Sequence, residues 1–435
     1  MITKIKNLAR RQFQGEAGGV FRGMITLAMG AGLARIVGLA SIPVLTRLYS
    51  PEDYGVLAIY TSIVAVLVPI LTLRYVTAIP LPKTDAMAFN LFMLCAKLIL
   101  VGTLLISLVL GFFGETVLGW FSMQEFAHLW WLIAIGVMGT ATYELFSLWA
   151  TRKKDYKVIA KTQFTQSLTG NAVKIGLGLL SLKPLGLVIG QLVAQSGGVG
   201  GLFKNAYKDF KKLYPSLSTK KQKIVAKYYQ EFPWFRLPSQ FLMVLSTQAP
   251  ILMMSSLYDK GSTGQLSLAM MALAMPIGLI GGAMSKAYYA EVAALGKNNI
   301  SRIKEVTFSI QKKLFAIGLP ITVIVMLLAK PIFSLVFGES WIVAGGFAAA
   351  LAPFILLQFT SSPLVQALNV VGSQLSFLII NVIRTIGFII IFYFFKKYNI
   401  VESTFIAVLS GFLCAFYLFQ TLFVLKTISS REGLK

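Results

Sequence analysis

The chain has 435 residues, of which 56% are hydrophobic and 13% are charged, and its net charge is +24. Soluble domains carry about 25% charged residues, so this composition excludes an ordinary soluble enzyme and indicates a membrane protein. Its apolar runs are continuous rather than alternating, which argues against a transmembrane β-barrel, and the basic charge is better explained by membrane topology than by nucleic-acid binding.

Twelve apolar runs follow one another along the chain, each of a length suited to a membrane-spanning helix. They lie at 21–46, 52–79, 85–113, 126–149, 158–181, 184–203, 235–257, 263–290, 312–338, 341–370, 373–395 and 401–426. The sequence therefore predicts an all-α, polytopic membrane protein with twelve transmembrane helices. Most of the 40 basic residues fall in the two terminal segments and the even-numbered loops. That asymmetry predicts that both termini are cytoplasmic.

The longest connection is rich in lysine and separates two sets of six runs. It reads "KNAYKDFKKLYPSLSTKKQKIVAKYYQEF" at 204–232. We predict an N-terminal six-helix bundle at 1–204, a basic cytoplasmic linker at 205–233 and a C-terminal six-helix bundle at 234–435. The linker is expected to be a solvated segment lying along the anionic inner leaflet.

A short polar island recurs at the same point of each set. "LYSPEDYGVL" at 48–57 matches "LYDKGSTGQL" at 257–266 in its Leu-Tyr pair, its glycine and its final leucine, with a shift of 209 residues. Each island connects the first and second runs of its set. Asp53 is predicted to cap the helix after the first island, and Ser262 or Thr263 the helix after the second.

A second match supports the first. "NAVK" at 171–174 and "NVIR" at 381–384 lie in the fifth run of their sets and are 210 residues apart. Two matches at nearly one shift predict a duplicated six-helix unit. We expect two pseudo-twofold-related bundles around a central cavity, a layout that suits alternating access.

Prolines fall at similar depths in the two sets. Pro43 and Pro250 lie near the outer ends of the first runs, and Pro69 and Pro276 lie at mid-depth in the second runs. Proline removes a backbone donor and permits a helix to bend. We therefore predict that these four positions are hinges.

Five basic residues lie inside predicted spans, where a cation costs about 2.5–3.5 kcal/mol. They are Arg35, Arg74, Lys97, Lys174 and Arg384. Such residues normally face protein or a wet cavity. Arg74 is close enough to the inner end of its span to reach the interface.

The fifth run carries a polar stripe with helical spacing. The stripe consists of Gln163, Ser167, Asn171, Lys174 and Gly178. Asn381 and Arg384 repeat it more weakly in the eleventh run. Two interpretations stay open: hydrogen bonding between helices, or the lining of a water-filled cavity.

Glu144 is the one acidic residue clearly inside a span, so the membrane interior is mainly cationic. Such an interior attracts anions, phosphates in particular, and repels cationic drugs. Glu144 either pairs with a nearby cation or acts as a proton-coupling carboxylate. The chain has no metal-ligand spacing and a single histidine, His128, so we expect neither a metal nor a cofactor.

The sequence "RLYSPEDYGVLAIYTSI" at 47–63, followed by "LRYVTAIPLPK" at 73–83, resembles the polysaccharide transporter family. This family includes the bacterial O-antigen and capsule repeat-unit flippases and belongs to the multidrug/oligosaccharidyl-lipid/polysaccharide exporter superfamily. The resemblance is sharpest over residues 20–95 and implies a flippase rather than an enzyme. Short outer loops also argue against a polysaccharide polymerase or ligase.

The resemblance implies the substrate, the location and the partners. A repeat unit on undecaprenyl pyrophosphate would cross from the inner to the outer leaflet of the bacterial inner membrane, through a cationic cavity. The candidate substrate-binding residues are Arg35, Arg74, Lys97, Asn171, Lys174, Asn381 and Arg384. Besides the lipid-linked substrate and membrane lipids, a polymerase and a chain-length regulator are candidate partners, and nucleic acid is not. The alternative function is a multidrug or cation antiporter of the same superfamily.

Overall fold

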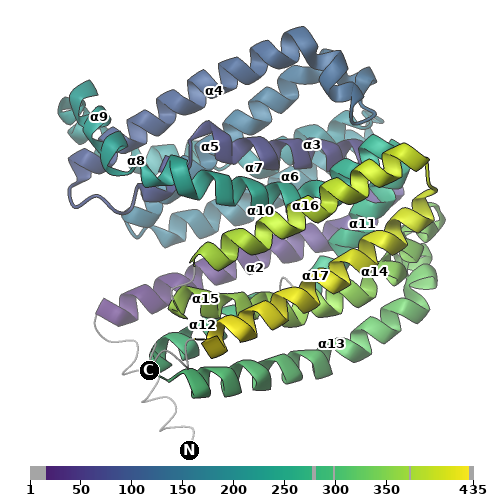
Figure 1. Cartoon of the computed structure of the whole chain (residues 1–435). Coiled ribbons are helices and arrows are strands. Elements are labelled where there is room, and N and C mark those ends of the chain that lie inside the picture. Colours follow the sequence, from purple (N-terminus) through teal and green to yellow (C-terminus); the bar gives the residue numbers. More distant parts are fainter. Residues whose placement is uncertain (1–15, 277–280, 297–298, 372–373, 431–435) are drawn as a thin grey trace, which may run out of the picture. The chain divides into compact units, whose positions relative to one another are not determined.

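The computed structural model describes residues 16–276, 281–296, 299–371 and 374–430, and all regular structure in these ranges is helical (Figure 1). In chain order the α-helices are α2 (Glu16–Leu48), α3 (Pro51–Leu71), α4 (Asp85–Gly119), α5 (Trp130–Arg152), α6 (Tyr156–Leu179), α7 (Leu185–Ser196), α8 (Val199–Leu213), α9 (Thr219–Tyr228), α10 (Leu237–Leu257), α11 (Lys260–Pro276), α12 (Gly282–Leu295), α13 (Ile300–Phe337), α14 (Ile342–Ser361), α15 (Gln366–Val371), α16 (Gln374–Tyr398) and α17 (Glu402–Ser430). The all-α prediction is confirmed.

Ten helical stretches of the described chain are long and apolar enough to cross a membrane. The protein is therefore a multi-pass membrane protein. The polar stripe of α6 makes that helix less apolar than its neighbours, and it is not one of the ten. The eighth predicted run is divided between α11 and α12, with 277–280 outside the described residues. The number of twelve spans stays a prediction.

The chain forms two compact units. Unit 1 contains the chain up to Tyr49, then Tyr60–Gly119 and Met123–Phe241, whereas unit 2 contains Ser50–Ile59, Trp120–Ser122 and the chain from Leu242 onward. Helix α3 therefore begins in unit 2 and continues in unit 1. The lysine-rich linker lies entirely in unit 1.

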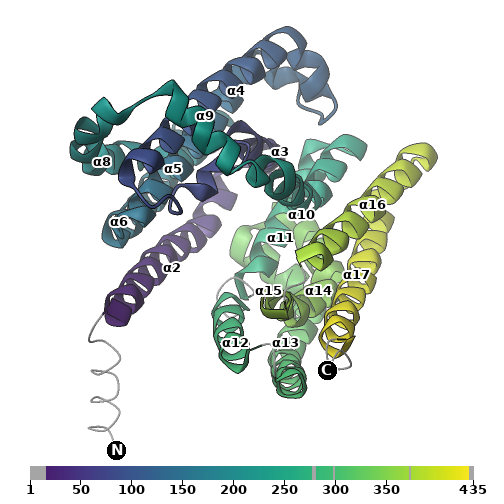
Figure 2. The same cartoon turned by 60° about the vertical axis from the view of Figure 1, so that its left-hand side comes forward.

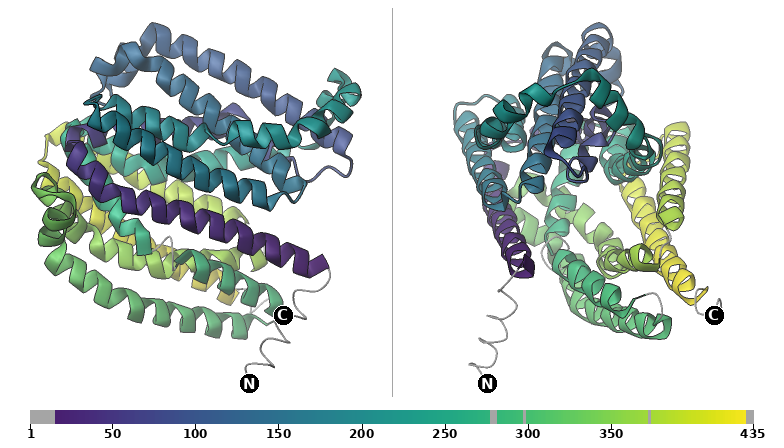
Figure 3. Two further views of the ribbon diagram at one scale, coloured as in Figure 1. Left: turned by 180° about the vertical axis from the view of Figure 1, so that it is seen from behind. Right: turned by 90° about the vertical axis from the view of Figure 1, so that its left-hand side faces the viewer.

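In unit 1, α2 packs along α6, α6 along α7, and α4 along α5 (Figure 3, left, shows α2 beside α6). The linker is not the solvated segment that the sequence predicted, because it folds into α8 and α9 and packs against α4 and α5. The ring of Phe210 on α8 lies among four aromatic rings, at centroid distances of 4.7 to 5.9 Å. These rings belong to Phe89, Phe92, Phe146 and Trp149.

Hydrogen bonds fix the turn between α8 and α9. The Asn90 amide on α4 donates to the Ser216 carbonyl at 3.1 Å and accepts from the Ser218 backbone N–H at 2.9 Å. The Tyr75 hydroxyl donates to the carbonyl of Ala226 on α9 at 3.1 Å. The linker therefore has a defined position on unit 1.

In unit 2, α13 packs along α14, and α17 packs against both α14 and α16 (Figure 1; Figure 2 shows the same helices turned). The Phe388 and Phe412 rings join α16 and α17 at a centroid distance of 5.3 Å. Large apolar residues of α13 such as Leu327 and Leu335 are 74% and 78% exposed, as expected for a helix that borders lipid.

In both islands a side chain caps the following helix, and the cap lies three or four residues before the predicted position. The backbone N–H of Asp53 is 3.3 Å from the Ser50 hydroxyl, and the Asp53 carboxylate accepts from the Ser50 N–H at 2.9 Å, a reciprocal capping box. In the second island the Asp259 carboxylate accepts from the Ser262 N–H at 2.8 Å. Asp53, Ser262 and Thr263 are thus not the caps. The true caps, Ser50 and Asp259, are again 209 residues apart.

The glycine shared by the islands marks a close crossing of α3 and α11 within unit 2. A Cβ atom on Gly55 would lie 1.9 Å from the carbonyl oxygen of Lys260, and one on Gly264 would lie 1.8 Å from that of Pro51. The two contacts are related by the same shift of 209 residues. Only glycine lets the backbones approach this closely, so the repeated glycine has a structural cause.

The four predicted hinge prolines occupy two kinds of position. Pro43 and Pro250 lie inside α2 and α10, as expected. The prediction of a mid-depth position was wrong for Pro69, because α3 ends two residues after it. Pro276 is the last described residue of α11, and the residues that follow it, 277–280, lie outside the described residues. Leu73 and Arg74 follow α3 with φ of 46° and 59°, which a continuing right-handed helix does not allow. A hinge role for the four stays a prediction.

Candidate functional site

Lys174 is buried within unit 1, with 8% of its surface exposed. Its Nζ atom donates to the Gln191 Oε1 on α7 at 2.7 Å. The helices come this close because glycine faces the lysine: a Cβ on Gly190 would lie 2.3 Å from the Lys174 Cγ. The Tyr49 hydroxyl donates to the Lys174 carbonyl at 2.7 Å. The ammonium group thus has a neutral amide as its described partner.

The other polar side chains of α6 fall into two groups. Some make hydrogen bonds to α2 or to their own helix, and others have a buried polar atom without a hydrogen-bond partner. Ser167 donates to the carbonyl of Ala34 on α2 at 2.7 Å, and the Asn171 amide donates to the Ser167 carbonyl of its own helix at 2.8 Å. In the described structure, the stripe residue Gln163 has a buried Oε1 without a hydrogen-bond partner, and Gln166, which is not part of the stripe, has a buried Nε2 without one. The Ser167 bond to α2 supports hydrogen bonding between helices, and the lining of a water-filled cavity stays a prediction.

Arg384 occupies the corresponding position on α16 in unit 2 and has more partners. Its Nε donates to the Ser246 hydroxyl on α10 at 2.9 Å, and one terminal nitrogen donates to the Met243 carbonyl at 3.3 Å. The same nitrogen is 3.4 Å from the Asn381 Oδ1. The guanidinium lies over the Phe416 ring, 5.6 Å from its centroid. The planar fork thus reaches several neutral acceptors at once.

Next to Phe416, a hydrogen bond joins α14 and α17. The Gln358 amide on α14 donates to the Tyr417 hydroxyl on α17 at 2.8 Å. Sequence analysis missed these partners, as it missed Gln191 and Ser246, because it concentrated on charges. Uncharged amides and hydroxyls inside otherwise apolar runs were the available signal.

Arg74 and Glu144 form an ion pair in unit 1, with Arg74 NH1 3.2 Å from Glu144 Oε1. Both side chains are mostly buried, at 17% and 30% exposure. Of the two roles predicted for Glu144, the structure supports pairing with a nearby cation. The pair joins the segment after α3 to α5.

Lys97 and Arg35 are exposed rather than buried. The Lys97 ammonium on α4 donates to the Oε1 of the buried Gln222 on α9 at 2.9 Å, so it helps to hold the linker helix. Each predicted cation described in detail here, Arg74, Lys97, Lys174 and Arg384, has its own partners.

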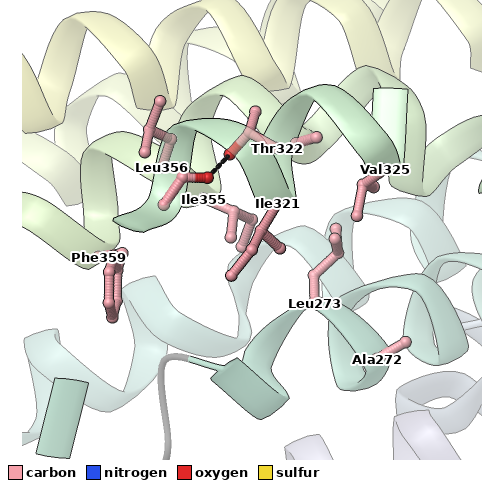
Figure 4. A pocket seen from close by; sticks show the side chains of 10 residues that line it. Ala272, Leu273, Ile321, Thr322, Val325, Ile355, Leu356 and Phe359 are labelled. Atoms are coloured by element: carbon pink, nitrogen blue, oxygen red, sulfur yellow. Dashed lines mark hydrogen bonds between the residues drawn. The ribbon is translucent and has the colours of Figure 1, made fainter. Parts of the chain in front are cut away.

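Unit 2 also contains an apolar pocket between α11, α13 and α14 (Figure 4). It is lined by Ala272, Leu273, Gly318, Ile321, Thr322, Val325, Ala352, Ile355, Leu356 and Phe359. The Thr322 hydroxyl donates to the Gly318 carbonyl at 2.9 Å, which uses the one polar side chain of the lining. This pocket suits hydrocarbon and is separate in chemistry from the cation sites.

A family model described as "Polysaccharide biosynthesis protein" matches residues 44–346, more than half of the chain. The chain belongs to the polysaccharide biosynthesis protein family. The family predicted from the first island is thereby confirmed. A search of curated proteins gave no match for this polysaccharide biosynthesis protein.

Solved structures with 16% sequence identity share its fold. An inward-facing multidrug resistance MATE family transporter of the MOP superfamily has a TM-score of 0.71 and covers 94% of this chain and 99% of its own. The lipid II flippase MurJ, in an inward closed conformation, has a TM-score of 0.70 and covers 92% and 87%. A variant of the Vibrio cholerae MATE transporter VcmN has a TM-score of 0.61 and covers 95% and 97%. At this identity, the matches show that the chain shares the fold of these transporters.

Proposed function

We propose that this protein is a flippase that moves an undecaprenyl-pyrophosphate-linked oligosaccharide repeat unit, such as an O-antigen unit, from the inner to the outer leaflet of the bacterial inner membrane. The observation that carries the proposal is the pair of intramembrane cations at matching positions, Lys174 and Arg384. Their described partners are neutral, so no carboxylate among these partners neutralises either charge, and an anion would supply the missing counter-charge. A diphosphate is the anionic part of such a substrate.

The sugar part of the substrate needs hydrogen-bonding groups rather than charge. The buried amide atoms of Gln163 and Gln166 without a described partner are of the right kind, because amides both donate and accept. Membership in a polysaccharide biosynthesis family supports a sugar-bearing substrate. The shared fold with a lipid II flippase supports transport of a lipid-linked precursor. A polymerase and a chain-length regulator would act on the exported product.

A multidrug or cation antiporter is the alternative, since MATE transporters share the fold. Such a protein needs an accessible carboxylate inside the membrane. Glu144 is the one acid placed there by the sequence, and Arg74 already holds it. This ion pair favours the anionic substrate. Both termini would lie in the cytoplasm, in keeping with the distribution of basic residues.

The test replaces each cation in a strain whose surface polysaccharide depends on this protein. Lys174→Ala and Arg384→Ala should each reduce surface polysaccharide about tenfold or more, because a charge-assisted contact contributes about 1.5–3 kcal/mol. Lipid-linked repeat units should accumulate inside the cell.

Lys174→Arg and Arg384→Lys keep the charge and should retain part of the export, and Lys330→Ala, at an exposed position of α13, is the surface control. Membrane fractions should contain all variants in equal amount. Normal surface polysaccharide in both alanine variants would refute the proposed site.

A further inference from the structure

Helix α8 presents a lysine-rich face to its surroundings. We call the exposed residues Lys204, Lys208, Lys211 and Lys212 the lysine face. The helical spacing puts them opposite the buried Leu202 and Ala206. The single acidic residue of α8, Asp209, is 3.5 Å from the Lys153 ammonium of the neighbouring α5 end, so its charge is directed away from the lysine face.

Exposed aromatic rings run beside this face. Phe203, Tyr207 and Tyr214 are 46%, 54% and 67% exposed, and their spacing of four and seven residues places them on one side of α8. We call them the aromatic stripe. In α9, Ile224 and Tyr228 are similarly exposed beside lysines. Aromatic rings next to cations are typical of helices that lie at a membrane interface.

The helices that carry these side chains are held in place. Phe210 packs among the aromatic rings of α4 and α5, Asn90 fixes the turn before α9, and Lys97 binds Gln222 of α9. A surface that is already ordered loses little conformational entropy when it binds a ligand. None of these three anchoring contacts uses the lysine face or the aromatic stripe.

We propose that α8 and α9 form an interfacial platform that binds the phosphate groups of anionic phospholipids. The lysine face pairs with the headgroups, and the aromatic stripe lies at the boundary between headgroups and acyl chains. An acidic protein or a nucleic acid would match the charge but not the exposed rings beside it. The inference goes beyond the proposed transport function and does not depend on it.

The test uses the purified full-length protein with phosphatidylglycerol and phosphatidylcholine as probes. Bound lipid is counted by native mass spectrometry. The wild-type protein should retain phosphatidylglycerol in preference to phosphatidylcholine. Lys→Gln changes at all four positions of the lysine face should weaken phosphatidylglycerol binding about tenfold or more. Raised salt should weaken it as well, because the Debye length falls.

Two matched variants show whether the effect belongs to this surface. Lys→Arg changes at the same four positions preserve the charge and should preserve binding. A second variant removes the same charge elsewhere, from exposed lysines of α13 and α17, by Lys304→Gln, Lys312→Gln, Lys313→Gln and Lys426→Gln. It should bind phosphatidylglycerol nearly as well as the wild type does.

Removal of two rings tests the second part of the platform. Tyr207→Ala with Tyr214→Ala should weaken binding of both lipids severalfold and leave the preference for phosphatidylglycerol intact. Equal losses in the lysine-face and control variants, or no lipid preference in the wild type, would overturn the proposal. All changed side chains are exposed, and a single symmetric elution peak confirms that each variant is folded.

Discussion

The repeat within this chain is kept in two places with different outcomes. At the islands, Gly55 and Gly264 make the same contact in both copies, each against a backbone carbonyl of the other helix. On α6 and α16, the matching cations have unlike surroundings: Lys174 binds one amide, whereas Arg384 binds a hydroxyl, a carbonyl and the face of a ring. Where two backbones approach this closely, only glycine fits. A buried cation, in contrast, can be stabilised by different sets of side-chain and backbone groups.

The largest expected effect tests the first half of this comparison. Gly55→Ala and Gly264→Ala should each destabilise the protein by about 3 kcal/mol or more, because the added Cβ meets a backbone oxygen that has no rotamer to change. Thermal unfolding followed by fluorescence-detected gel filtration measures the loss.

Gly176→Ala on α6 is the matched control, since a Cβ there meets nothing within 4 Å, and it should be neutral or slightly stabilising. A tolerated alanine at one island glycine alone would show that the crossing is not reciprocal.

An intermediate effect should separate the two cations. Lys174→Met removes a buried charge that has one neutral partner and should leave the thermal stability unchanged or higher. Arg384→Met should lower the stability by about 1–3 kcal/mol, because the buried Ser246 hydroxyl loses the donor that it accepts from and the Phe416 ring loses its cation.

The same unfolding assay serves both variants. Equal destabilisation by Lys174→Met and Arg384→Met would mean that Lys174 also has stabilising partners. The proposed difference between the surroundings of the two cations would then be wrong.

The smallest effect concerns the helix starts. Ser50→Ala and Asp259→Ala remove side chains that accept from the first turn of α3 and α11, and each should cost about 0.5–2 kcal/mol. Asp53→Asn keeps an acceptor at the other side of the capping box and should cost less than Ser50→Ala. Thermal unfolding measures the loss of stability in both cap variants. Similar losses would show that the two islands resemble each other in their capping side chains as well as in their backbones.

The sequence alone predicted the helical fold, because membrane spans leave strong patterns, and it singled out the glycine pair that makes matching contacts. It predicted α3 to continue to residue 79, since the non-glycine residues Leu73 and Arg74 give no sign of the positive φ that follows Leu71. It also favoured Asp53 over Ser50 as the cap, although Pro51 suits the first helical position and indicates the earlier start.

The lysine-rich linker shows a further limit. Its high charge suggested a solvated chain, yet Leu202, Ala206 and Phe210 recur every four residues and form an apolar face that packs on unit 1. The intramembrane cations of the candidate site could be identified directly from the sequence. Their partners could not, because Gln191 and Ser246 are common polar residues whose importance depends on which helices meet.

The reciprocal glycine crossing has an evolutionary consequence. A contact in which each partner offers the other the same pair of atoms is isologous, the kind found on the axis of a homodimer. An ancestor of half this length, meeting its own twin, would have made it with a single glycine codon. In the present chain the two codons are independent, so Gly55 and Gly264 must each be maintained by separate selection.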